Sequence, residues 1–135
     1  MKTETLNNRF PVEENRSVIG SLYSFNLLSL IEKMRQKQAW LNGELYSMVL
    51  LNQHDKQVLL TALHEGVEIN SFQANDSVTF QVIAGELKLH TQEESTILDE
   101  GQLITLHEHI NYRLTAALET VFLTAIANGA LPAGI

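Results

Sequence analysis

Most of the chain after Gly43 consists of short apolar segments separated by residues that favour turns. Polar and apolar side chains alternate along many of these segments, as in ELYSMVLLN and VTFQVIAG, and a period of two is typical of β-strands. Turn sequences such as Asp99-Glu100-Gly101 interrupt them about every 8–12 residues, a spacing typical of sandwiches and barrels. We therefore predict an all-β domain over residues 44–127.

One segment before these strands has helical periodicity. Within SFNLLSLIEKMRQKQAW, four apolar residues recur at the spacing of one helix face: Leu27, Leu30, Ile31 and Met34. Ser24 or Asn26 can cap this helix, and Asn42-Gly43 ends it. The pattern predicts an amphipathic helix over residues 24–41 that covers one face or opening of the sheet.

The two ends of the chain have no clear period. Residues 1–23 contain Pro11, which interrupts any helix, and we expect them to form an arm. Residues 128–135, NGALPAGI, are expected to form a flexible tail.

Composition excludes several classes of protein. The chain has 135 residues, enough for one domain, and a net charge of −7 without basic runs, which disfavours nucleic acid as a partner. It has no cysteine, so disulfides, thiolate-bound zinc and thiol catalysis are excluded. The polar N-terminus lacks a secretory signal, and no apolar stretch reaches the roughly 18–20 residues of a membrane span. We expect a soluble, cytoplasmic protein that binds no membrane.

Two stretches of the strand region, which begin at Gly66 and at Gly101, have glycines at positions that match known sequence motifs. The pattern Gly-x5-His-x-His-x3-Glu-x6-Gly can be laid from Gly66 to Gly85, and Gly-x5-Pro-x-Gly-x2-His-x3-Asn begins at Gly101. These two patterns are the motifs of the cupin superfamily. The segment VTFQVIAGELKL resembles the strand–turn–strand of the first motif, and LDEGQLITL resembles the turn that leads into the second. The resemblance covers residues 45–127 and implies a cupin-type jelly-roll β-barrel, preceded here by the N-terminal α-helix and arm.

The metal-ligand positions of these motifs carry other side chains. The two histidines of the first motif fall on Phe72 and Ala74, its glutamate on Val78, and the histidine of the second motif on Tyr112. A divalent cation needs three or four converging nitrogen or oxygen ligands, and only the phenol of Tyr112 has a suitable oxygen. We therefore expect neither a metal nor another cofactor.

If the family geometry holds, these positions form a cavity in the barrel. Val78, Phe80 and Val82 point inward from one strand, and Phe72 and Tyr112 face them across the mouth. Such an apolar cavity suits a small organic ligand, although a filled and inert core has the same composition. Three roles remain open for Tyr112: it hydrogen-bonds a ligand, it closes the cavity by packing on Phe72, or it is exposed.

The histidines are the other candidates for chemistry. His107 and His109 are two residues apart, a spacing that chelates metals in extended structure. Because they occupy loop positions of the second motif, we expect them to face solvent or a dimer surface; the alternatives are a displaced metal or ligand site and a hydrogen-bonding role in a pocket. His64 follows an apolar strand and is expected to be a satisfied buried or edge histidine, or else an acid or base in a pocket. Carboxylates such as Glu93-Glu94 lie in turns and are expected to be solvated.

Three functions remain open. The favoured one is a non-catalytic, metal-free barrel that binds a small organic molecule in an apolar cavity. The second is a metal-dependent oxygenase or isomerase built on His107, His109 and His64. The third is a structural or interaction module with a filled barrel. No set of nucleophile, base and orienting residue can be assembled, so no catalytic residue is assigned. The resemblance also implies a homodimer, whose contacts would protect sheet edges.

Overall fold

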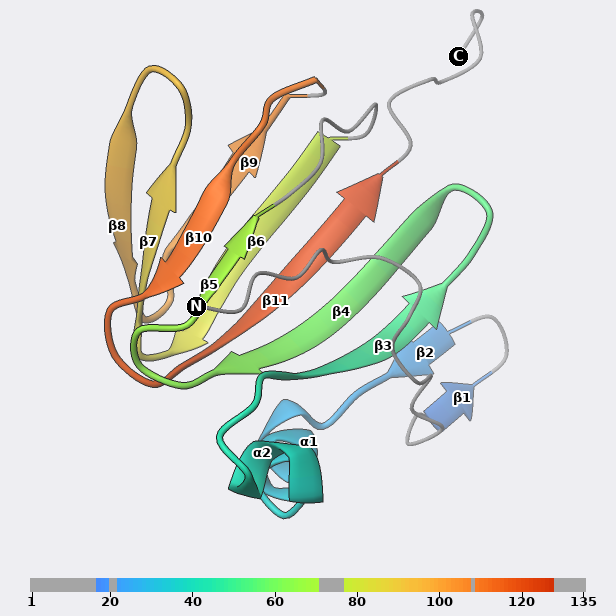
Figure 1. The fold of residues 1–135 in the computed structure, drawn as a ribbon. Coiled ribbons are helices and arrows are strands. Elements are labelled where there is room, and N and C mark those ends of the chain that lie inside the picture. Colours follow the sequence, from blue (N-terminus) through green and yellow to red (C-terminus); the bar gives the residue numbers. More distant parts are fainter. Residues whose placement is uncertain (1–16, 20–21, 71–76, 108, 128–135) are drawn as a thin grey trace, which may run out of the picture.

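Two antiparallel sheets face each other in the computed structural model, which describes residues 17–19, 22–70, 77–107 and 109–127 (Figure 1). One has the strand order β5–β10–β7–β8, with the bounds β5 (Glu68–Asn70), β7 (Glu86–His90), β8 (Ser95–Asp99) and β10 (Arg113–Ala116). The other has the order β3–β4–β11–β6–β9, with the bounds β3 (Tyr46–Asn52), β4 (Lys56–Leu63), β6 (Ser77–Ala84), β9 (Leu103–Leu106) and β11 (Thr120–Ala127). The predicted all-β fold is confirmed.

The N-terminal part of the described chain adds a hairpin and two helices. Two short strands, β1 (Ser17–Ile19) and β2 (Leu22–Ser24), pair with each other. They lie in the predicted arm except for Ser24, which was predicted to belong to the helix but ends β2. Residues 1–16 of that arm and the predicted tail, residues 128–135, lie outside the described residues. Neither helix in the described part of the chain has the length and apolar character needed to cross a membrane.

Alternate residues of the strands fill the space between the two sheets. In β6, Val78, Phe80 and Val82 are buried, and the residues between them are less so. Leu87 and Leu89 of β7 enter the same cluster from the four-stranded sheet. Burying one such side chain contributes about 1.5–3 kcal/mol, so this shared core holds the two sheets together.

The five-stranded sheet is also apolar on part of its outer face, where residues of two helices pack against it. Figure 1 shows these helices beside the start of β3. These are α1 (Leu27–Met34) and α2 (Gln38–Leu41). Asn26 caps α1, because its side-chain oxygen accepts a hydrogen bond from the Ser29 backbone N–H at 3.1 Å. The second cluster consists of Leu30, Ile31, Met34 and Trp40 from the helices and Met48, Leu50, Leu60, Ala62 and Val121 from the sheet.

The helix predicted over residues 24–41 is divided into two by an extended residue, Lys37 (φ −72°, ψ 142°). A continuous helix would place Leu41, seven residues after Met34, on the buried face. The break instead buries Trp40, which is 6% exposed, and leaves Leu41 64% exposed. The larger apolar side chain therefore reaches the sheet.

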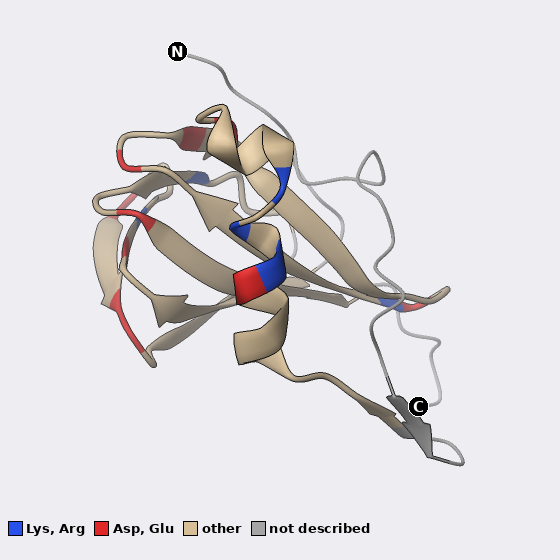
Figure 2. Cartoon of the chain, turned by 90° about the horizontal axis from the view of Figure 1, so that it is seen from below, with Lys and Arg blue, Asp and Glu red and all other residues tan. Residues whose placement is uncertain are grey.

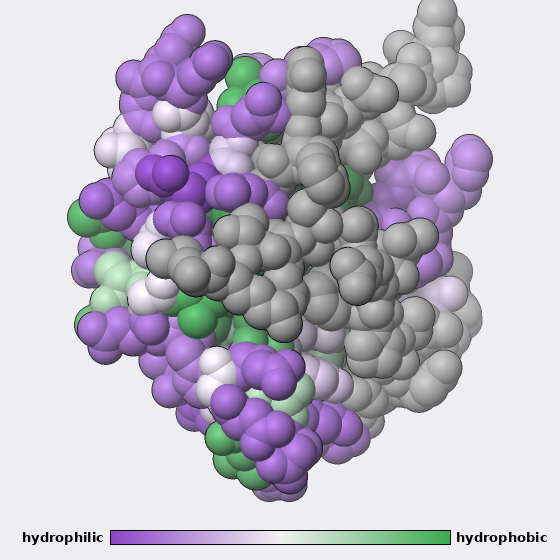
Figure 3. Space-filling view, viewed as in Figure 1, coloured by the Kyte–Doolittle hydropathy of each residue, from purple (hydrophilic) through white to green (hydrophobic). Residues whose placement is uncertain are grey.

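The surface of the described residues is mostly hydrophilic. The segment from α1 to α2 carries one acidic residue, Glu32, and three basic residues, Lys33, Arg35 and Lys37, and all four are exposed (Figure 2). Purple, hydrophilic residues dominate the described surface in Figure 3, where green residues form only small areas. The large exposed hydrophobic residues are Tyr23, Leu28, Leu41, Ile97, Leu103, Ile110 and Leu118.

The turn between β6 and β7 depends on a glycine. Gly85 has a φ of +97°, and a Cβ built on it would collide with the carbonyl oxygen of Glu119 and lie 2.6 Å from Thr120 Oγ1. Only a residue without a side chain fits between this turn and the one that leads into β11.

We predict that Gly85→Ala destabilises the protein far more than Gly66→Ala. Gly66 also has a positive φ (+87°), but a Cβ at this position would have no other atom within 4 Å. The backbone strain of an alanine costs about 1–2 kcal/mol at either position, and the collision at Gly85 adds about 1–3 kcal/mol. Urea unfolding of both variants measures the difference, and equal losses would contradict the close approach at Gly85.

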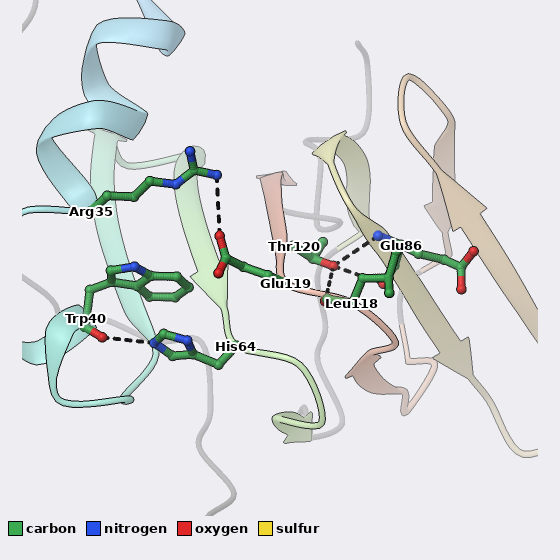
Figure 4. Close-up of polar contacts among 7 residues, drawn as sticks. All are labelled: Arg35, Trp40, His64, Glu86, Leu118, Glu119 and Thr120. Atoms are coloured by element: carbon green, nitrogen blue, oxygen red, sulfur yellow. Dashed lines mark hydrogen bonds and ion pairs between the residues drawn. The ribbon is translucent and has the colours of Figure 1, made fainter.

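Two buried threonines on β11 differ in their hydrogen bonding. Thr120 Oγ1 accepts a bond from the Glu86 N–H at 3.0 Å, and it lies 2.7 Å from the carbonyl oxygen of Leu118, to which its hydroxyl can donate (Figure 4). Thr124 Oγ1 is buried without a hydrogen-bond partner. The Thr120 hydroxyl connects the β6–β7 turn to β11. The Thr124 hydroxyl is removed from water on folding and gains no hydrogen bond in exchange.

Replacing each threonine by valine should therefore have opposite effects. Thr120→Val leaves the Glu86 N–H without its acceptor and should lower the free energy of unfolding by about 1–3 kcal/mol. Thr124→Val removes an unsatisfied hydroxyl and should leave stability unchanged or raise it by up to about 1 kcal/mol. Denaturant unfolding at a common pH checks both variants. A loss at Thr124 as large as that at Thr120 would mean that its hydroxyl is satisfied.

Candidate functional site

A cavity of about 470 Å³ lies at the end of the strands where β7 turns into β8 and where β9 ends. β8 is the edge of the four-stranded sheet and β9 is the edge of the five-stranded sheet. The cavity therefore lies between two edge strands, β8 and β9, that do not pair with each other. Its described lining consists of Leu89, residues 91–96, residues 104–107 and residues 109–111.

Four apolar residues contribute to this lining: Leu89, Ile104, Leu106 and Ile110. Leu89 belongs to the buried core, and Ile104 and Leu106 pack against it. Ile110 is 38% exposed and borders the open side. The cavity thus continues the apolar core outward to solvent.

A hydrogen-bonded turn forms one polar wall. The Thr91 N–H donates to the Glu94 carbonyl oxygen at 2.8 Å, and the Glu94 N–H donates to Thr91 Oγ1 at 3.2 Å. The N–H of Glu93 also approaches Thr91 Oγ1, at 3.4 Å. Thr91 therefore fixes the backbone that carries two carboxylates beside the cavity.

The loop after β9 forms the facing wall. His107, His109 and Asn111 line the cavity, and all three are exposed. His109 has a φ of 69°, the one positive φ among the described non-glycine residues. Histidine tolerates this left-handed conformation better than most side chains, and it turns the chain so that Ile110 and Asn111 follow along the cavity.

Of the predicted ligand-binding residues, Val78, Phe80, Val82 and Tyr112 lie in the core beside this cavity, whereas His64, described below, does not. Val78, Phe80 and Val82 are 4%, 0% and 0% exposed. Tyr112 is buried and meets Phe80 edge to face, with ring centroids 5.1 Å apart. The predicted contact of Tyr112 with Phe72 involves a residue outside the described part of the chain. A ligand contact by this set stays a prediction.

His64 lies at the opposite end of the strands. It follows the last residue of β4, which pairs with Thr120 at the start of β11. The cavity borders Leu106, which pairs with Val78, and Val78 in turn pairs with Ile126 near the end of β11. The strand register therefore separates His64 from the cavity.

His64 instead joins a helix to the sheet. Its ring stacks on Trp40, with centroids 3.5 Å apart and planes at 14°, and its Nε2–H donates to the Trp40 carbonyl oxygen at 2.9 Å (Figure 4). An ion pair of 3.4 Å between Arg35 and Glu119 fixes α1 to the β10–β11 turn at the same end. His64 is therefore a histidine with a hydrogen-bond partner inside the protein, which is the role that the sequence favoured.

His107 and His109 are exposed, as expected, but they also line a cavity. Their side chains belong to a loop rather than to a strand, because β9 ends at Leu106. Within the described ranges, no three histidine, aspartate or glutamate residues are grouped closely enough to hold a metal ion.

The sequence did not identify the 91–94 turn as part of a site. Glu93 and Glu94 were expected to be solvated turn residues, and both are indeed exposed. The turn-forming sequence TQEE between two alternating segments signals a loop, but it does not say which other loop lies beside it.

Comparison with known proteins identifies the fold. No protein-family model matches the chain, and no curated protein matches it in sequence. A cupin superfamily protein from Desulfitobacterium hafniense is similar in structure, with a TM-score of 0.60 and 13% identity over 62% of this chain and 77% of that chain. The conserved SPY1581 protein of unknown function from Streptococcus pyogenes has a TM-score of 0.64 and 17% identity, over 90% of this chain and 97% of that chain.

An enzyme is similar as well. A variant of salicylate 1,2-dioxygenase from Pseudoaminobacter salicylatoxidans has a TM-score of 0.65 and 14% identity, over 77% of this chain and 34% of that chain. At these identities the likeness concerns the fold. Together with the two facing antiparallel sheets and the glycine turns between their strands, it shows that this chain has the cupin fold.

Proposed function

We propose that this chain binds a small organic molecule in the cavity between the 91–94 turn and residues 104–111, without a resident metal. The observation that carries the proposal is the cavity itself, which joins an apolar floor to a polar rim. Its volume of about 470 Å³ is within the range of ligand pockets, which is about 300–1,000 Å³.

The lining supports a ligand with two kinds of surface. Leu89 and Ile104 offer apolar contacts next to the core. His107, Asn111 and Thr96 offer hydrogen-bonding groups around them. In such a site the apolar contacts supply most of the affinity, and a few polar groups orient the ligand.

The residues at the metal positions of cupins do not fit a metal. Val78, at the position of the glutamate, has no atom that binds a cation and is packed in the core. Tyr112, at the position of a histidine, packs its ring against Phe80. Metal chemistry at these positions is therefore not part of the proposal, although the fold itself occurs both in an enzyme and in a protein of unknown function.

We predict that Ile110→Trp weakens the binding of N-phenyl-1-naphthylamine, an uncharged probe that fluoresces in apolar surroundings. The indole would occupy part of the cavity, and the dissociation constant should rise about tenfold, as expected for the loss of about 1.4 kcal/mol of contacts. Titration of the protein into the probe measures the change.

Ile97→Trp is the matched control. Ile97 is also exposed and lies on β8, but it does not line the cavity. Its variant should bind the probe as the parent chain does. Equal losses in the two variants, or a parent chain that does not bind the probe, would refute the proposed site.

A further inference from the structure

We infer that the cavity selects organic cations, and that its ligand class is an apolar body carrying a protonated amine. This inference rests on the proposed function and adds the chemical class of the ligand. It is drawn from the acidic residues that line the cavity, Glu93 and Glu94, and from the absence of lysine and arginine among the described lining residues.

Among the described lining residues of the cavity, two are acidic and none is a lysine or an arginine. The acidic residues are Glu93 and Glu94. The net charge of −7 adds a general attraction for cations.

The cations of the neighbouring sheet are directed elsewhere. Lys88 alternates with the buried Leu87 and Leu89 and therefore belongs to the outer face of the four-stranded sheet. Arg113 pairs with Glu68, with Nε and Oε2 3.3 Å apart. Neither side chain lines the cavity, so the carboxylates there are not neutralised by them.

The turn fixes the backbone that carries the two acidic residues. Thr91 hydrogen-bonds the backbone of Glu93 and Glu94, so this backbone does not need to reorganise when a ligand binds. An ammonium group can donate three hydrogen bonds, and the carboxylates and the hydroxyl of Thr96 can accept them. The hydrocarbon part of the ligand would then lie on Leu89 and Ile104. A carboxylate ligand would meet like charges at the same rim.

Three compounds with one skeleton test this inference: 3-phenylpropylamine, 3-phenylpropan-1-ol and 3-phenylpropanoate. Each displaces N-phenyl-1-naphthylamine from the protein at low ionic strength and about pH 8, where histidines in general are neutral. We expect the amine to bind about fivefold more tightly than the alcohol, and the acid to bind most weakly. The preference should shrink in about 0.5 M salt, because the carboxylates are exposed.

The double variant E93Q/E94Q should bring the amine to within about twofold of the alcohol, because it weakens amine binding more than alcohol binding. The control E44Q/E65Q removes the same charge from exposed residues away from the cavity and should keep the preference. An amine that binds no better than the alcohol, or a preference that survives E93Q/E94Q, overturns the inference while alcohol binding upholds the proposed function. If neither the probe nor any of the three compounds binds, the proposed function fails and the inference fails with it.

Discussion

The five-stranded sheet is apolar on its inner face and on the part of its outer face formed by β3, β4 and β11, and this determines what must surround it. Phe80 and Phe122 point to one side, and Leu60 and Val121 point to the other. Neither face is stable in water, so each needs a covering layer. The four-stranded sheet covers the inner face, and α1 and α2 cover the part of the outer face formed by β3, β4 and β11.

Local patterns in the sequence predicted the parts of the fold that depend on neighbouring residues. Alternation along β6 indicated correctly that Val78, Phe80 and Val82 point inward, since a period of two is a property of the strand alone. The spacing of Gly66 and Gly85 indicated the fold because turns are also a local property: each glycine has a positive φ that few other residues can adopt. The division of the helix was not predictable in this way, because it depends on where the sheet has room for a large side chain.

The candidate site was only partly predictable, because its two walls are brought together by strand order. Spacing alone drew attention to His107 and His109, although they line the cavity from a loop rather than from a strand. Nothing local distinguishes Glu93 and Glu94 from other turn carboxylates. They border the cavity because β8 and β9, joined by a short turn, lie at the edges of different sheets. That arrangement is a property of the whole barrel.

The stacked pair of Trp40 and His64 and the ion pair of Arg35 with Glu119 lie at one end of the strands, whereas the cavity lies at the other. The cavity rim consists of exposed turn and loop residues that the core does not require. Substitutions there would be nearly neutral for folding, while those around the buried aromatic rings would not. The rim of this chain is therefore free to vary in evolution, while the barrel beneath it would persist with little alteration.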